Sequence, residues 1–160
     1  MPVATKPVAK PIPEGFSTVT PYMNVADAAA AIAFYTKVFG AREIMRMAMP
    51  DGKIIHAQIE IGDSAVMLAD EHELMQNYSP ETLNGTSVSF YLHVPDVDAT
   101  FDLAIQEGAT VVREVEDRFY GDRVGVLADP FGHIWSLAMH IEDVPQDEIR
   151  NRAAALFQSH

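Results

Sequence analysis

The sequence has 160 residues and no cysteine, so it can form neither disulfides nor thiolate metal sites, and no cysteine can act as a nucleophile. Basic residues are scarce, since 11 lysines and arginines stand against 23 aspartates and glutamates, a formal net charge of −12. No basic run occurs along the chain, and a nucleic-acid surface needs clustered positive charge. We therefore expect no nucleic-acid partner.

Two catalytic signatures are missing as well. No serine lies in a nucleophile elbow, so a Ser-His-Asp triad cannot be argued from the sequence. No glycine-rich loop follows a strand, which removes the usual cradle for a phosphate or a dinucleotide. Catalytic residues are therefore left unassigned, and the sequence leaves open whether the protein is an enzyme.

Long apolar runs are also absent, and none approaches the ~20 residues that a membrane-spanning helix requires. Residues 1–15 contain four prolines and lack the apolar centre of a secretory signal. We therefore expect no membrane partner and a cytoplasmic location. Because proline cannot occupy a helix interior or a central strand, we interpret residues 1–15 as a flexible proline-rich arm.

What the sequence does contain is an internal repeat. Residues 22–27 (YMNVAD) align with residues 91–96 (YLHVPD), about 69 residues later. The aspartate that ends each segment is a typical helix N-cap, and the glycines Gly40 and Gly108 are placed to end the two helices. Each copy therefore predicts a strand, a capped helix and three further strands.

The predicted elements follow this repeat. In the first copy we expect strands over 17–25, 41–49, 54–61 and 65–69 and a helix over 28–39; in the second, strands over 87–94, 109–115, 123–128 and 133–140 and a helix over 97–107. The last two strands are joined by the tight turn Asp129-Pro130-Phe131-Gly132. The expected fold class is α+β: two tandem βαβββ modules forming a curved mixed sheet around a cleft, plus a C-terminal helix.

The chain is expected to be one structural domain with five parts. These are the arm (1–15), the first module (16–70), a polar linker (71–86), the second module (87–141) and the C-terminal helix (142–160). In that last helix Ile149, Ala153 and Leu156 are predicted to form the buried face.

Paired βαβββ modules, with Thr20-Pro21-Tyr22 opening the first, resemble the vicinal oxygen chelate superfamily, which includes glyoxalase I, extradiol dioxygenases, and bleomycin and fosfomycin resistance proteins. The segments 55–59 (IHAQI), 120–123 (YGDR) and 129–135 (DPFGHIW) are most similar to its PhnB-like, glyoxalase-related branch. The resemblance covers residues 16–140. It implies a small-molecule cleft and a homodimer.

The resemblance also bears on metal binding. Metal-dependent members carry histidine, glutamine or glutamate ligands on the first and last strand of each module. The matching positions here are Thr20, Met67, Ser89 and Ser136, none of which is an imidazole or a carboxylate. We therefore predict no metal cofactor, although a divalent metal at an unconventional site around His56 stays open.

Candidate ligand-binding residues come from strand alternation. His56 and Gln58 alternate with apolar residues, so they face either the cleft or solvent, whereas Trp135 falls on the face that packs against the helices. Arg123 could offer a fork for a carboxylate or phosphate, or form a surface salt bridge. The full set of candidates is Tyr22, His56, Gln58, Ser89, Tyr91, His93, Tyr120, Arg123 and Ser136.

These features predict a glyoxalase/bleomycin-resistance-like protein that binds a small organic molecule in the cleft between its modules, without the usual metal. The alternative is a metal-dependent lyase, isomerase or dioxygenase with a non-standard ligand set around His56. A third hypothesis is an interaction module whose cleft is filled by its own side chains. The expected partners are a small-molecule ligand and a second copy of the chain, onto which the arm and the C-terminal helix would cross.

Overall fold

The structure is a computed structural model that describes residues 4–158. It contains two four-stranded mixed sheets with the same strand order. The first module holds β1 (Tyr22–Val25), α1 (Ala28–Phe39), β2 (Arg42–Ala48), β3 (Ile54–Ile61) and β4 (Ser64–Asp70), in the order β1-β4-β3-β2. The second holds β5 (Ser89–His93), α3 (Val97–Gln106), β6 (Thr110–Asp117), β7 (Asp122–Ala128) and β8 (Ile134–His140), in the order β5-β8-β7-β6. The predicted α+β class with tandem modules is confirmed.

Local chemistry sets the helix ends. The carboxylate of Asp27 accepts a hydrogen bond from the Ala30 N–H, and that of Asp96 accepts one from the Ala99 N–H. α1 ends at Gly40, whose φ of +67° lies in the left-handed region that glycine adopts without a steric penalty. The predicted bounds of α1 and of β3 agree with the structure.

The first strand is shorter than predicted, because only residues 22–25 form it. Pro21 has no N–H to give to a sheet, although its carbonyl accepts from the Met67 N–H. β1 lies at the edge of its sheet, and within residues 4–158 its one partner strand is β4, which runs parallel to it. β5 repeats this arrangement by pairing in parallel with β8.

The linker is more ordered than its polar composition indicated. It contains the short 3₁₀ helix η1 (Glu73–Met75) and the single-turn helix α2 (Pro80–Leu83). The carboxylate of Glu71 accepts hydrogen bonds from the Ser79 N–H at 2.7 Å and from the Thr82 hydroxyl at 2.8 Å. These bonds fix the linker against the end of β4.

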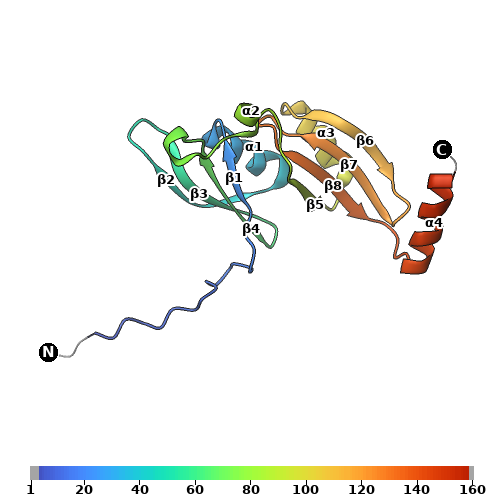
Figure 1. Ribbon diagram of the computed structural model, residues 1–160, viewed down its shortest axis with the longest axis horizontal. Coiled ribbons are helices and arrows are strands. Elements are labelled where there is room, and N and C mark those ends of the chain that lie inside the picture. The colour runs from blue at the N-terminus through green and yellow to red at the C-terminus, as the bar shows by residue number, and fades with distance from the viewer. Residues whose placement is uncertain (1–3, 159–160) are drawn as a thin grey trace.

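The two modules share one hydrophobic core. Figure 1 shows their sheets side by side, with α1 and α3 near the middle of the molecule. Tyr35 of α1, Phe101 of α3 and Trp135 of β8 are all buried in the same cluster. The prediction that Trp135 lies in the core is confirmed.

A single carboxylate joins the modules inside that core. Asp129, at the start of the β7–β8 turn, accepts hydrogen bonds from the Tyr35 hydroxyl at 2.5 Å and the Trp135 indole N–H at 2.9 Å. It also accepts from the backbone N–H groups of Phe131 and His133. Burial and the neighbouring carboxylate raise the pKa of Tyr35 well above its usual value, so the phenol keeps the proton that it donates.

Residues 4–15 and the C-terminal helix α4 (Gln146–Gln158) lie at opposite ends of the molecule (Figure 1). In Figure 1 the exposed residues 4–15 extend away from the first module, and α4 stands beside the second. The predicted buried face of α4 is wrong: Ile149 and Ala153 are half-buried and Leu156 is exposed. Arg152 instead anchors the helix, through an ion pair with Glu142 and a hydrogen bond to the Phe119 carbonyl. No helix within residues 4–158 is long and apolar enough to cross a membrane.

Candidate functional site

Each sheet has one face packed on its helix and one face directed away from it, which we call the open face. Strand register identifies the residues on it, because directly opposed residues on neighbouring strands point to the same side. In the second module Arg113 is opposite Val126, Val126 opposite Ser136, and Ser136 opposite Tyr91. The corresponding row of the first module is Met45, Gln58, Met67 and Tyr22.

On the first module's open face, the structure brings together three of the predicted residues. The Tyr22 hydroxyl lies 2.9 Å from Nδ1 of His56, and their rings are 5.6 Å apart. Gln58 lies between Met45 and Met67 in the row. The alternation that placed His56 and Gln58 on one face is therefore correct.

On the second module's open face, a hydrogen-bond network centres on Asp122. The Tyr91 hydroxyl donates to Oδ2 of Asp122 at 2.6 Å and lies 3.4 Å from the Tyr120 hydroxyl. Nδ1 of His140 lies 2.7 Å from Oδ1 of Asp122, and Nε2 of His93 lies 4.0 Å from Oδ2. Ser136 is beside Tyr91 in the row, and Ser89 is two residues before Tyr91 on β5.

The electrostatics of this network are set by its hydrogen bonds. Nε2 of His140 also lies 2.7 Å from Asp143, so both ring nitrogens face carboxylates, which raises the pKa of His140. Desolvation opposes ionisation of Asp122, but the hydrogen bonds from Tyr91 and His140 outweigh it and lower the pKa of Asp122. Burial, and then the bond to Asp122, raise the pKa of Tyr91. Asp122 is therefore an anion, and Tyr91 is a neutral donor to it.

Arg123 lies on the other side of the sheet from the predicted site. Its guanidinium pairs with Asp98 of α3 at 2.8 Å and with Asp117 at 3.0 Å. Gly125, two residues later, faces the Phe101 ring, where an added Cβ would lie 2.7 Å away. Arg123 thus occupies the helix-facing side, and the salt-bridge interpretation replaces the ligand-binding one.

The second module's open face contains a hollow of about 220 Å³. Its floor is a small apolar cluster, separate from the main core, in which Val124, Val126 and Ala138 are buried and Tyr120 is partly buried. The residues that line the hollow are Tyr91, Arg113, Arg118, Phe119, Tyr120, Val124, Val126 and Ser136. Arg113, Arg118, Phe119 and Asp122 were not among the candidates from the sequence.

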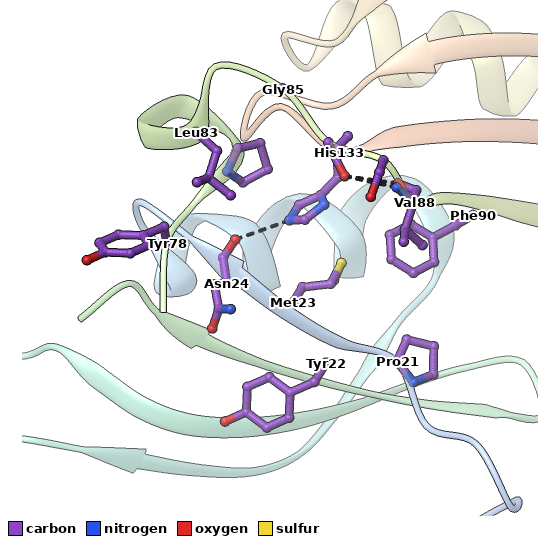
Figure 2. A pocket seen from close by; sticks show the side chains of 13 residues that line it. Pro21, Tyr22, Met23, Asn24, Tyr78, Leu83, Gly85, Val88, Phe90 and His133 are labelled. Atoms are coloured by element: carbon purple, nitrogen blue, oxygen red, sulfur yellow. Dashed lines mark hydrogen bonds between the residues drawn. The ribbon is translucent and has the colours of Figure 1, made fainter. Parts of the chain in front are cut away.

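A larger cavity of about 400 Å³ lies where the two modules meet, between β1, the linker and the start of β8. Tyr22 is the only candidate from the sequence that lines it. Figure 2 shows His133 beside Asn24, where the imidazole Nε2 donates to the Asn24 backbone carbonyl at 3.2 Å. Tyr78 and Leu83 come from the linker, so this wall could not be foreseen while the linker was expected to be irregular.

The residues present do not fit the metal site of metal-dependent relatives. Met67 and Ser136 lie in the open-face rows beside Tyr22 and Tyr91, while Thr20 and Ser89 lie near the starts of β1 and β5. Hydroxyls and a thioether are poor ligands for a divalent ion that prefers imidazole and carboxylate. Within residues 4–158 no group of three or more histidine, aspartate or glutamate side chains could hold a metal ion.

The sequence and the fold agree on the family. Residues 16–137 match the Glyoxalase/Bleomycin resistance protein/Dioxygenase superfamily. The chain belongs to this superfamily. The predicted resemblance to vicinal oxygen chelate proteins is thereby confirmed.

Relatives within the superfamily extend this result. An uncharacterized protein of Mycobacterium bovis is 48% identical over 135 residues, covering 82% of this chain and 89% of its own. The structure of TioX from Micromonospora sp. ML1 is similar with a TM-score of 0.59 and 26% identity, over 78% of this chain and 99% of that one. A glyoxalase/bleomycin resistance protein/dioxygenase family enzyme from Burkholderia phytofirmans has a TM-score of 0.58 and 27% identity, and the match covers 75% of this chain and 97% of that one. The PhnB protein of Bacillus cereus, at 19% identity and a TM-score of 0.61 over 77% and 99%, shares the fold.

Proposed function

We propose that this protein binds a small organic molecule on its open sheet faces, with the hollow of the second module as the main contact, and that it does so without the divalent ion of its metal-dependent relatives. The observation that carries this proposal is the hollow itself. It combines an apolar floor with a few polar groups at its rim, which is the usual make-up of a small-molecule site.

One rim group, the phenol of Tyr91, is held in a fixed position. Tyr91 is bonded to Asp122, and Asp122 is bonded in turn to His140, so the phenol cannot swing away from the hollow without breaking this chain of bonds. A side chain that is already immobilised loses little entropy when a ligand binds. The network therefore favours a preformed binding surface.

We further propose that a second copy of the chain covers the open faces in a homodimer. All seven residues of β2 are exposed, as are most of those of β6. Three large side chains on or beside the first module's row are also exposed: Met45 to 38%, Met47 to 48% and Tyr22 to 48% of their surface. Uncovered apolar side chains on a sheet face favour a protein partner. Sedimentation of the full chain and of a form that begins at residue 16 tests this assembly and the contribution of the arm to it.

A direct test uses 1-naphthalenemethanol, a neutral aromatic probe, in an NMR titration of the intact protein. We expect shifts at Val124, Val126 and Ser136, with a dissociation constant in the range of about 0.1–1 mM that is typical of a fragment-sized ligand. Replacing Ser136→Met places a larger side chain in the hollow and should weaken binding about tenfold or more. Thr36→Met, on the exposed side of α1, is the matched control and should leave binding unchanged. Shifts that avoid the second module's open face would show that the proposal is wrong.

A further inference from the structure

One cation on the second module's open face has no partner. Arg113 lines the hollow and is the β6 member of the row that continues through Val126 and Ser136 to Tyr91. Among residues 4–158 it has no ion pair and no side-chain hydrogen bond, whereas Arg118 beside it is paired with Glu116 at 2.6 Å. The guanidinium of Arg113 is therefore available to a ligand.

The charge of the hollow is opposite to that of the chain. Acidic residues outnumber basic ones 23 to 11 overall, yet the residues that line the hollow include two arginines and no aspartate or glutamate. Two carboxylates lie next to lining residues, and both are already engaged: Asp122 accepts from Tyr91 and His140, and Glu116 is paired with Arg118. An acidic protein that presents an unpaired arginine over an apolar floor favours a ligand of negative charge.

The hydrogen-bond donors that remain point the same way. The Tyr91 hydroxyl donates its proton to Asp122. In the hydrogen bond between the Tyr91 and Tyr120 hydroxyls, which lie 3.4 Å apart, Tyr120 is therefore the donor. The donors left for a ligand within the row are the guanidinium of Arg113 and the hydroxyl of Ser136. A planar carboxylate can accept two parallel bonds from a guanidinium, which makes it a better match than a single hydroxyl.

We propose that the ligand of this hollow is an organic carboxylate whose anionic group binds Arg113 and whose flat apolar body lies on Val124 and Val126, against Phe119 and Tyr120. This inference rests on the proposed function and adds the chemical class of the ligand. The first module provides the contrast, because the matching position in its row is Met45 and the row contains no charge. The two open faces therefore differ in the ligand groups that they recognise.

The test compares two probes of the same shape, 1-naphthoate and 1-naphthalenemethanol, by NMR titration of the intact protein. We expect naphthoate to bind about tenfold more tightly, with the preference falling as salt rises because Arg113 is exposed. Arg113→Met, which installs the side chain of the first module's row, should weaken naphthoate binding about tenfold and leave naphthalenemethanol binding unchanged. Arg150→Met makes the same change in net charge on an exposed site of α4 and should alter neither probe.

The outcomes separate the two proposals. The carboxylate assignment is overturned, and the binding site is left in place, in either of two cases. In the first, naphthalenemethanol binds at Val126 and Ser136 and naphthoate binds no more tightly. In the second, the preference for naphthoate survives Arg113→Met. Loss of the preference in Arg150→Met as well shows that net charge, not Arg113, is responsible, which also overturns it. Absence of shifts at the hollow with both probes overturns the carboxylate assignment together with the proposed function.

Discussion

The two modules have the same strand order and carry different chemistry on the same framework. Their rows align position by position, with Tyr22 matching Tyr91 at the edge strand and Met45 matching Arg113 at the opposite edge. In the first module the tyrosine meets an imidazole, and in the second it meets a carboxylate that is bonded to an imidazole. The framework of a repeated fold therefore constrains where side chains point, while each copy is free to change what they are.

The modules also differ in the contacts of an aspartate that follows or ends one of their strands. Asp129 in the second module is buried and accepts four hydrogen bonds, two from side chains and two from the backbone. Asp70 in the first is half-buried and accepts from the backbone N–H groups of Ala28 and Ile54. The second module's aspartate reaches into the first module, whereas the first module's aspartate stays within its own.

Replacing these two aspartates tests that difference and should give the largest effect. Asp129→Ala leaves Tyr35, Trp135 and two backbone donors without partners inside the core, which should cost about 4 kcal/mol of unfolding free energy. Asp70→Ala should cost about 1–2 kcal/mol, because water can reach the groups that it exposes. Urea unfolding of both variants measures the two values. Equal losses would show that the contact between modules contributes little to stability.

The hairpins that precede β3 and β7 allow a second comparison. Gly121, with a φ of +101°, has no room for a Cβ, which would lie 2.1 Å from the Glu142 carbonyl oxygen. Gly52 has a similar φ of +89° and nothing within 4 Å. Gly121→Ala should therefore cost about 2–4 kcal/mol by strain and overlap, and Gly52→Ala about 1 kcal/mol by strain alone.

Thermal unfolding of the two glycine variants checks this ordering. Because Gly121 also positions the loop that carries Tyr120, the Gly121→Ala variant should lose binding at the hollow even at temperatures where it is folded. If both variants unfold at the same temperature, the crowding at Gly121 has no energetic consequence.

The histidine network of the second module predicts the smallest effect, a pH dependence. The carboxylates of Asp122 and Asp143 raise the pKa of His140 above its usual 6.5. The stabilisation of the folded state by protonated His140 is therefore complete below about pH 6.5, and it is lost as the pH rises through the folded-state pKa of His140. For Asp122, whose pKa is lowered from 3.8, stabilisation is present above about pH 4 and is lost on further acidification.

His140→Gln is the variant that isolates the first of these effects. Its unfolding midpoint should lie below that of the unmodified protein at pH 6, and the gap should narrow as the pH rises above 7. Denaturant midpoints at a series of pH values measure the gap, with Asp143→Asn expected to reduce it partly. A gap that is constant with pH would mean that the folded network does not raise the pKa of His140.

Much of the framework could be predicted from the sequence because its signals are local. Asp27 and Gly40 fix both ends of α1, and alternation on β3 placed His56 on the correct face. The side of the sheet on which Arg123 lies could not be predicted, because β7 is buried on both faces and its apolar residues have no period that distinguishes the sides. Arg113 was missed because the pairing of β6 with β7 shifts register on either side of it.

The rest of the candidate site depends on contacts between distant segments. Asp122 and His140 are 18 residues apart, and the wall of the junction cavity comes from a linker that has no periodic pattern. α4 shows the reverse failure: its sequence has an apolar stripe, but within residues 4–158 Ile149 and Ala153 are only half-buried and Leu156 is exposed. A periodic pattern indicates that a face can be buried; what buries it has to come from elsewhere.

The bond between Tyr35 and Asp129 has a mechanical consequence. Because a buried side chain of one module is tied to a turn of the other, the two sheets cannot rotate about the linker without exposing that pair to water. This bond therefore opposes rotation of one sheet against the other, and the hollow does not depend on such a rotation, because every residue that lines it belongs to the second module.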